Sequence, residues 1–155
     1  MSGAQTDIEA VEAANTALYD AVEHGDVDAL SSLWLEAEIS VVHPGWPVLT
    51  GRGEVLRSYA LIMASTEYIQ FFLTDVQIAV LGDTAGVTCT ENILSGGPSE
   101  DDGSAGPLVG GLVVATNVFR RTEGGWRLWS HHGSPVLVEQ EGDEDDGESD
   151  TDVEL

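Results

Sequence analysis

The hydrophobic periodicity changes along the chain, and this change restricts the fold more than any single motif does. In most of the first 64 residues, apolar side chains recur every three or four positions, as on one face of an α-helix. From residue 68 onward they alternate with polar side chains over long stretches, which is typical of β-strands with one face on a core. Helices followed by long strands predict an α+β fold.

Three helices are expected. The first covers residues 6–23 and is followed by Gly25, which can adopt the left-handed conformation that stops a helix. Asp26 can cap a second, short helix that carries the apolar side chains of residues 27–34. The third helix covers residues 54–64 and follows a Gly-rich turn, in which Arg52 is interpreted as a structural residue.

The strands are expected at residues 38–43, 68–80, 85–94, 108–121 and 126–138. Short Gly-containing turns follow two of the long strands, so the last four are expected to pair antiparallel. The Gly-, Ser- and Asp-rich residues 95–107 are expected to form an exposed loop, whose acidic part is either a lid or a tolerated insertion. The element order predicts three helices packed on one strongly curved antiparallel or mixed sheet.

The charge is strongly one-sided, with 28 acidic residues, five arginines, no lysine and a formal net charge of −23. Such a surface repels phosphate backbones and resembles the surfaces of proteins from salt-loving microbes. No apolar run is long enough to cross a bilayer, and the N-terminus lacks the pattern of a signal peptide. We therefore expect a cytoplasmic, halophilic protein that binds neither nucleic acid nor membranes.

One domain is expected over residues 6–138, because 155 residues suffice for one sizeable core. Residues 139–155 form a separate segment by composition, since ten of these 17 residues are acidic. This composition is typical of a solvated, disordered tail.

Glu91 is a polar residue on an otherwise apolar strand face. Alternation places it with Val87, Cys89 and Ile93, and Cys89 is interpreted as a small buried hydrophobic residue. A carboxylate there is costly to bury without a partner. Two interpretations are open: Glu91 pairs with an arginine at a wet strand end, or it has a raised pKa suited to proton transfer.

Three histidines lie in strand-like sequence. His43 shares the apolar face of its strand with Ile39 and Val41, so it is expected to point inward. In the last strand, alternation predicts that His132 points inward and His131 outward, unless a bulge at Gly133 reverses the order. Imidazole exchanges protons near neutral pH, so inward histidines indicate proton chemistry or ligand recognition. The alternative is a histidine in the core or in a dimer interface.

Several short motifs, taken in order, resemble the SnoaL-like branch of the nuclear transport factor 2 superfamily. The motifs are residues 17–34, His43-Pro44-Gly45, residues 49–52, residues 116–120 and residues 126–135. The resemblance implies a cone-shaped α+β barrel that encloses a pocket and commonly forms homodimers. Members include ketosteroid isomerase, scytalone dehydratase, limonene epoxide hydrolase and polyketide cyclases, and others only bind ligands.

The resemblance also bears on individual residues. His43 and Pro44 occupy the place of the Asp-Pro pair that carries the isomerase's proton-abstracting carboxylate. The isomerase's oxyanion-binding tyrosine corresponds to Leu18, and Tyr19 is expected to face differently, so the isomerase mechanism is not carried over. Tyr59 and Asn117 are alternative hydrogen-bond donors to an anionic oxygen, or structural residues.

Three functional hypotheses follow. The first is a cofactor-independent enzyme acting on an apolar small molecule by isomerisation, cyclisation, dehydration or hydrolysis, with His43 as general base and Glu91 or His132 as acid or orienting partner. The second is a non-catalytic binding or dimerisation module. The third, which we disfavour, is a metal site formed by His43, His132 and Glu91. The residues expected to contact the ligand are Trp34, Trp46, Tyr59, Asn117 and His131.

Overall fold

The computed structural model describes residues 3–96 and 107–137, which form three helices and a six-stranded mixed sheet. Its helices are α1 (Gly3–Glu23), α2 (Val27–Leu33) and α3 (Arg52–Ala64). Its strands are β1 (Ser40–Val42), β2 (Leu49–Thr50), β3 (Tyr68–Leu81), β4 (Thr84–Gly96), β5 (Leu108–Thr122) and β6 (Gly125–Pro135). The predicted α+β class is confirmed. Residues 97–106, within the expected loop, and residues 138–155, which include the expected tail, lie outside the described residues.

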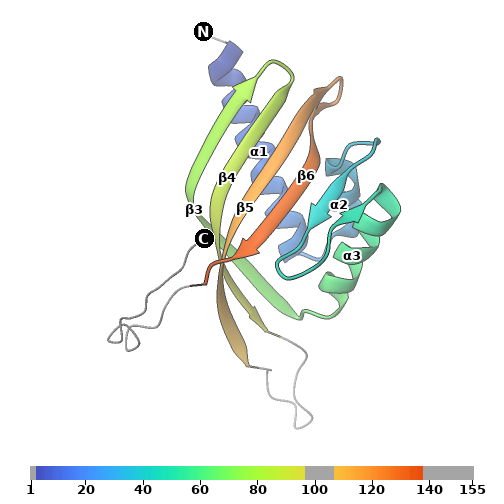
Figure 1. The fold of residues 1–155 in the computed structure, drawn as a ribbon, viewed down its shortest axis with the longest axis vertical. Coiled ribbons are helices and arrows are strands. Elements are labelled where there is room, and N and C mark those ends of the chain that lie inside the picture. The colour runs from blue at the N-terminus through green and yellow to red at the C-terminus, as the bar shows by residue number, and fades with distance from the viewer. Residues whose placement is uncertain (1–2, 97–106, 138–155) are drawn as a thin grey trace.

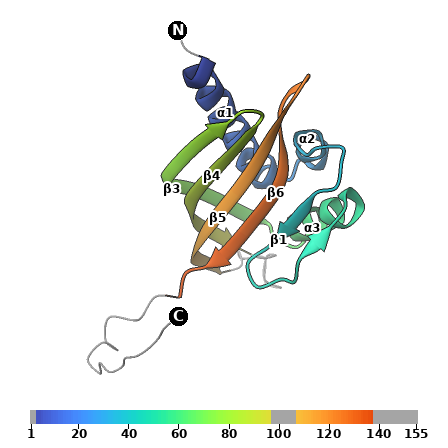
Figure 2. The same cartoon turned by 45° about the horizontal axis from the view of Figure 1, so that its top comes forward.

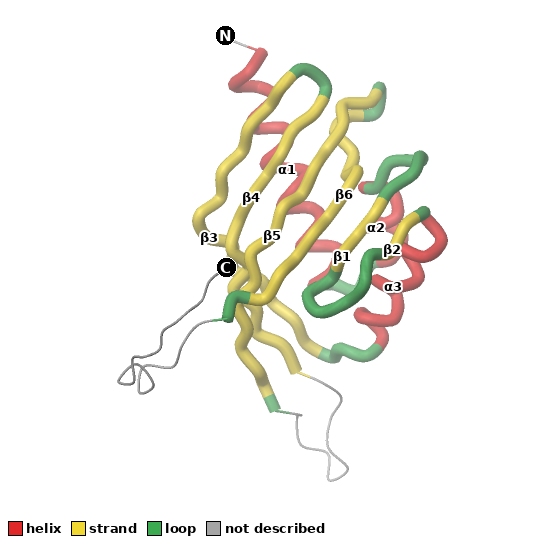
Figure 3. The backbone as a smooth tube through the Cα atoms, in the orientation of Figure 1, coloured by secondary structure: helices red, strands yellow, loops and turns green. Residues whose placement is uncertain are grey.

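The sheet has the order β2-β1-β6-β5-β4-β3, and it is curled but not closed (Figures 1 and 3). The strands β3 to β6 pair antiparallel as predicted, whereas β1 runs parallel to β6 and makes the sheet mixed. Figure 2 shows α1 crossing behind the long strands, with α2 and α3 beside β1 and β2. One face of the long strands is therefore covered by helix, and the other is open.

The predicted helix boundaries differ by a few residues, and α2 ends at Leu33, one residue before the expected Trp34. Helix α1 begins three residues before the expected start, and α3 begins at Arg52 rather than at residue 54. A first helical turn needs no apolar face, so the periodicity does not reveal it. Asp26 caps α2 as predicted, because its Oδ1 accepts a hydrogen bond from the Ala29 amide at 3.0 Å.

The strand β2 was not predicted from the sequence. It pairs antiparallel with β1 through the turn that contains Pro44 and Gly45, and Gly45 has a φ of 84°. Two residues are too few to show an alternating pattern, so the sequence contains no signal for this strand. The expected strand at 38–43 is shorter, at Ser40–Val42, and the last strand ends at Pro135 rather than at 138.

The hydrophobic core lies between α1 and the inner face of the sheet. Its most deeply buried side chains include Val11, Leu30, Trp34, Val41, Val55, Val87, Phe119 and Leu128. Cys89 is also buried, as expected. No described helix is both long and apolar enough to span a membrane.

Arg52 connects the end of α2 to the start of α3. Its guanidinium donates hydrogen bonds to the carbonyl oxygens of Trp34 at 3.1 Å and Leu35 at 2.9 Å, and to Ser31. The acceptors lie in the last turn of α2 and in the two residues that follow it. The structural interpretation of Arg52 is thereby confirmed.

Candidate active site

A cavity of about 210 Å³ opens between α1, α3 and the inner face of the sheet. Its walls are mostly apolar and aromatic, and its polar groups come from α1, α3, β4, β6 and the segment after β1. The lining residues are Leu18, Tyr19, Val22, His43, Pro44, Trp46, Tyr59, Ile62, Ile69, Phe71, Glu91, Ile93 and His131. An apolar cavity with a few convergent polar groups is the usual form of a small-molecule site.

Glu91 points into this cavity from β4 and is 4% exposed, so its predicted inward orientation is confirmed. Its partner is Tyr19, whose hydroxyl donates a hydrogen bond to Oε2 at 2.6 Å. Burial raises the pKa of the Glu91 carboxyl, and the Tyr19 bond opposes this rise only in part. The expected alternative of an arginine partner is therefore wrong.

Tyr19 corrects a second expectation. The resemblance places the isomerase's oxyanion-binding tyrosine at Leu18 and predicts that Tyr19 faces differently, but both side chains line the cavity. The Tyr19 side chain is buried and packs edge-on against Phe71, with ring centroids 5.0 Å apart. Burial and the nearby Glu91 carboxylate raise the pKa of its hydroxyl, so Tyr19 stays protonated.

His43 is buried, as expected, and is held by a serine on α3. Its Nε2 lies 2.8 Å from Oγ of Ser58, and this hydroxyl donates to the Val55 carbonyl at 2.7 Å. A hydroxyl group has one proton, and the Ser58 hydroxyl donates its proton to the Val55 carbonyl. Toward His43 the Ser58 oxygen can therefore only accept, so Nε2 of His43 must carry a hydrogen and donate it. Nδ1 is then unprotonated, and no described residue donates a hydrogen bond to it.

The environment of His43 favours the neutral imidazole. The rings of Trp46 and Tyr59 meet it edge-on, each with a centroid distance of 4.8 Å. Desolvation lowers the pKa of His43 to about 4. Its imidazole is therefore uncharged at neutral pH and can accept a proton from a ligand without first losing one.

The two adjacent histidines point in the opposite directions to those predicted. His131 is buried and lines the cavity, whereas His132 is exposed on the opposite face of the sheet. The cause is a bulge, because Phe119 pairs with Leu128 but Val118 pairs with Ser130, which leaves Trp129 without a partner. One extra residue reverses the alternation in the rest of the strand.

His131 is held by Asn117 on the neighbouring strand β5. Its Nδ1 lies 2.5 Å from Oδ1 of Asn117, and the Asn117 amide donates to Asn15 at 2.8 Å and to the Tyr19 hydroxyl at 3.2 Å. Desolvation, with smaller contributions from the neighbouring His43 and His132, lowers the pKa of His131 to about 3. His131 is thus a second neutral imidazole, with its ring centroid 6.3 Å from that of His43.

The remaining predicted ligand contacts divide into two groups. Tyr59 and Trp46 line the cavity, and Trp46 is 38% exposed at its margin. Trp34 and Asn117 do not line it: Trp34 is a core residue packed against Tyr59, and Asn117 lies fully buried behind His131 and Tyr19. Sequence reasoning missed Ser58 and Asn15, whose polar character in a helix has no distinguishing pattern.

The residues of the hypothetical metal site do not converge. His43 and Glu91 line the inner cavity, but His132 lies on the outer face of the sheet. Among residues 3–96 and 107–137, no three histidine, cysteine or acidic side chains are grouped as metal ligands. The combination proposed from sequence is therefore wrong.

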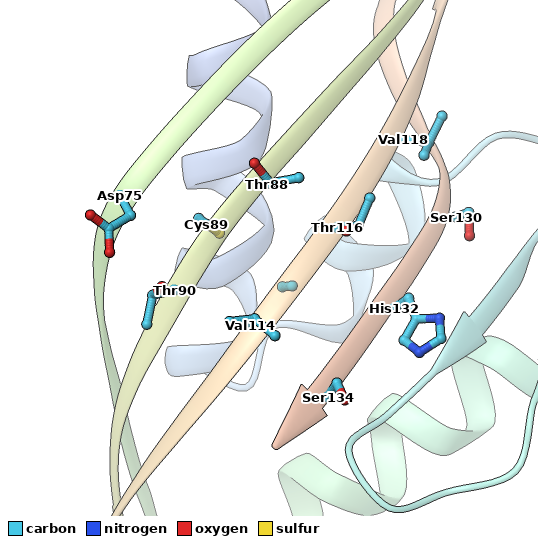
Figure 4. Close-up of a pocket in the computed structure, with 11 residues that line it drawn as sticks. Asp75, Thr88, Cys89, Thr90, Val114, Thr116, Val118, Ser130, His132 and Ser134 are labelled. Atoms are coloured by element: carbon cyan, nitrogen blue, oxygen red, sulfur yellow. The ribbon is translucent and has the colours of Figure 1, made fainter. Parts of the chain in front are cut away.

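A second, wider hollow lies on the outer face of the sheet, on the side away from α1 (Figure 4). Its floor carries the hydroxyl side chains of Thr88, Thr90, Thr116, Ser130 and Ser134, next to Val114, Val118 and His132. Asp75 stands at one margin, where β3 changes register and its backbone has a φ of 55°. Large apolar side chains are also exposed on the strands of this sheet, at Phe72, Leu112, Val114 and Trp129.

Comparison with known proteins gives one domain family and one fold. The family model of a SnoaL-like domain matches residues 11–139. A candidate dehydratase of the NTF2-like family from Streptomyces avermitilis is 68% identical, with a TM-score of 0.82 over 86% of this chain and 99% of that one. A ketosteroid isomerase-like protein from Erwinia carotovora atroseptica is 16% identical, with a TM-score of 0.70 over 85% of this chain and 98% of that one. At this identity the similarity shows the fold alone.

A plant protein shows a more distant similarity. The F-box protein SKIP8 of Arabidopsis thaliana is 25% identical over 134 residues, which cover 85% of this chain and 52% of the plant protein. This chain therefore spans about half the length of that relative.

Proposed function

The chain belongs to the SnoaL-like domain family, and on this premise we propose that its inner cavity binds a neutral, largely apolar small molecule and transfers protons on it without a cofactor. The family includes isomerases and dehydratases, so membership alone leaves the reaction open. The observation that carries the proposal is the way His43 is hydrogen-bonded and oriented. Ser58 holds its Nε2, and Nδ1 remains as an unprotonated acceptor on a residue that lines an apolar cavity.

The ligand class follows from the charges around the cavity. None of the five arginines lines it, and both of its imidazoles are neutral at pH 7 because burial lowers the pKa of each. The whole chain carries a formal charge of −23. An anionic ligand would meet no compensating cation in the cavity, and a neutral one has no such penalty.

Dehydration is the reaction that these groups support best. His43 Nδ1 takes a proton from a carbon of the substrate, and the electron pair of that C–H bond forms a C=C bond. The neighbouring C–O bond breaks, and a protonated Glu91 gives its proton to the departing hydroxyl, so that water leaves. The raised pKa of Glu91 favours its protonated form, and the similarity to the candidate dehydratase of Streptomyces avermitilis supports the same class.

Proton abstraction can be tested before the natural substrate is known. Neutral β-hydroxy ketones with apolar substituents are incubated with the protein in D₂O, and C–H exchange and loss of water are followed by proton NMR. We expect exchange that falls by roughly 10²-fold or more in His43→Ala, the range of general-base catalysis. His24→Ala is the matched control, because His24 is exposed. Equal exchange in both variants contradicts the proposed role of His43.

A non-catalytic binding function is the second candidate. It is favoured by the lowered pKa of His43, about 4, which makes its imidazole a weak base. In that case the wild-type protein binds neutral apolar compounds without exchange or turnover, and His43→Ala changes only the affinity. Calorimetry combined with the exchange assay separates the two candidates.

We also propose that a second copy of the chain covers the outer face of the sheet. The exposed apolar side chains of Phe72, Leu112 and Val114 support this partner. Two copies repel each other through their net negative charge, so the dimer is expected to weaken at low salt. Sedimentation analysis of the wild type and of Val114→Asp tests it: a wild-type monomer at high salt contradicts the proposal.

A further inference from the structure

We infer that Asn117 is a positioning residue, which fixes His131 in the tautomer with hydrogen on Nδ1 and thereby turns an unprotonated Nε2 toward the cavity. A role of this Nε2 in catalysis rests on the proposed function, whereas the assignment of the tautomer does not. Asn117 itself does not line the cavity and is fully buried.

The orientation of the Asn117 amide follows from its neighbours. Its Nδ2 lies 2.8 Å from Oδ1 of Asn15 and 3.2 Å from the Tyr19 hydroxyl. The single proton of that hydroxyl goes to Glu91 at 2.6 Å, so the Tyr19 oxygen acts as acceptor toward Asn117. Both neighbouring oxygens, Oδ1 of Asn15 and the Tyr19 hydroxyl oxygen, act as acceptors. The nitrogen of the Asn117 amide must therefore face them.

The oxygen of the same amide therefore faces His131. A carbonyl oxygen only accepts, so the ring nitrogen 2.5 Å away must donate. Nδ1 of His131 then carries the hydrogen, and Nε2 of the neutral ring carries a lone pair. No described residue donates a hydrogen bond to Nε2, and His131 lines the cavity.

These bonds form one chain whose donors all point the same way. His131 donates to Asn117, Asn117 donates to Tyr19, and Tyr19 donates to Glu91. The chain crosses from β6 through β5 and α1 to β4, so it joins two polar groups of the cavity that lie on separate strands. Because buried polar networks have few alternative arrangements, each member restricts its neighbours.

The consequence concerns what the cavity offers to a ligand. Nδ1 of His43 and Nε2 of His131 are both unprotonated, and the two rings are 6.3 Å apart. Without the hydrogen bond to Asn117, His131 would be free to adopt the other tautomer, in which Nε2 carries the hydrogen and is a donor toward the cavity. Asn117 thus decides whether this side of the cavity accepts or donates a hydrogen bond.

The tautomer is measured directly by two-bond ¹H–¹⁵N correlation NMR of the histidine rings at pH 7. In the wild-type protein we expect His131 to show a protonated Nδ1 and an unprotonated Nε2. The experiment needs no substrate, so it can fail or succeed independently of the proposed dehydration. A wild-type His131 with hydrogen on Nε2, or on both nitrogens, overturns the inference.

Substitutions then identify the residue responsible. Asn117→Leu, of similar volume, is expected to shift His131 wholly or partly to the Nε2-protonated form. Tyr19→Phe is expected to leave the tautomer unchanged, because Asn15 still orients the amide. Asn92→Leu is the matched control, since Asn92 bonds to Phe72 and Thr74 away from the cavity.

A folded Asn117→Leu variant that keeps hydrogen on Nδ1 overturns the role of Asn117. If this variant does not fold, the wild-type and Tyr19→Phe spectra decide, and a changed tautomer in Tyr19→Phe also counts against the inference.

Discussion

The Tyr19 hydroxyl donates a 2.6 Å hydrogen bond to Glu91, although the two residues are 72 positions apart in the chain. The bond joins helix α1, which crosses the inner face of the sheet, to strand β4. It satisfies a buried carboxyl group that has no cationic partner among the described residues. Tyr19 is therefore the residue through which α1 contributes a polar group to the cavity wall.

Tyr19→Phe is expected to destabilise the protein by roughly 1–3 kcal/mol, because it leaves a buried carboxyl group without its hydrogen-bond donor. The Tyr19 bond lowers the pKa of Glu91, so the substitution is also expected to raise that pKa further. Urea unfolding measures the first effect, and ¹³C NMR titration of the carboxyl measures the second. Tyr68→Phe is the control, because its hydroxyl bonds to Gln70 at the surface. Equal losses in the two variants would contradict a special role for Tyr19.

Glu91→Gln is expected to change how stability depends on pH. The folded-state pKa of Glu91 lies above its unfolded value, so the folded state binds more protons between the two. The free energy of unfolding of the wild type therefore falls as pH rises through this window, and the variant lacks that contribution. At pH 7 the variant is expected to be at least as stable as the wild type. Unfolding from pH 4 to pH 8, with exposed Glu36→Gln as control, tests this difference.

The two inward histidines are expected to titrate far below the usual range, with pKa values of about 4 for His43 and about 3 for His131. The unfolded chain binds protons near pH 6.5 and the folded protein does not, so stability is lost as pH falls from about 6.5 toward 4. His43→Gln is expected to remove on the order of 3 kcal/mol of this pH dependence. NMR titration of the ring protons checks the values, and a midpoint near 6.5 for His43 is incompatible with its described burial.

Arg52→Leu is expected to reduce the free energy of unfolding by about 2–4 kcal/mol, because the carbonyl groups of Trp34 and Leu35 lose a charged donor. Arg57→Leu on the same helix is the matched control, since Arg57 is exposed and its loss is expected to cost less than about 0.5 kcal/mol. Chemical denaturation measures the free energy of unfolding of both variants. Similar losses in the two would show that Arg52 does not hold α2 to α3.

Stability is expected to rise with salt concentration, because a net charge of −23 repels itself within each chain. Raising NaCl from 0.1 M to 1 M shortens the screening length from about 10 Å to about 3 Å. Thermal unfolding at both concentrations measures the effect. A variant ending at residue 138, which keeps 18 acidic residues and five arginines, is expected to respond more weakly. A melting temperature that is independent of salt would argue against a halophilic protein.

Much of the fold was predictable because its signals are local. The capping of α2 by Asp26 and the four long strands depend on residues close together in the chain, and the structure confirms them. The inward orientation of His43 and Glu91 was also predictable, since no irregularity interrupts the alternation before either residue. The two-residue strand β2 was not, because a strand of this length has no period.

The candidate site was only partly predictable, because its decisive contacts are between distant residues. Asn117 was expected to touch the ligand, and instead it lies behind His131 and Tyr19. Ser58, which holds His43, resembles any other serine in a helix until the helix is placed against β1. Such partners depend on how elements pack, which a single sequence does not report.

The sequence by itself determined the order of helices and strands and the apolar faces that meet in the core, because periodicity follows from local geometry. Only the tertiary structure decided which histidine enters the cavity. The bulge at Trp129 arises where β6 pairs with β5, and this one unpaired residue exchanges the positions of His131 and His132. Strand pairing thus determined which imidazole the cavity contains, since a shift of one residue reverses every side chain beyond it.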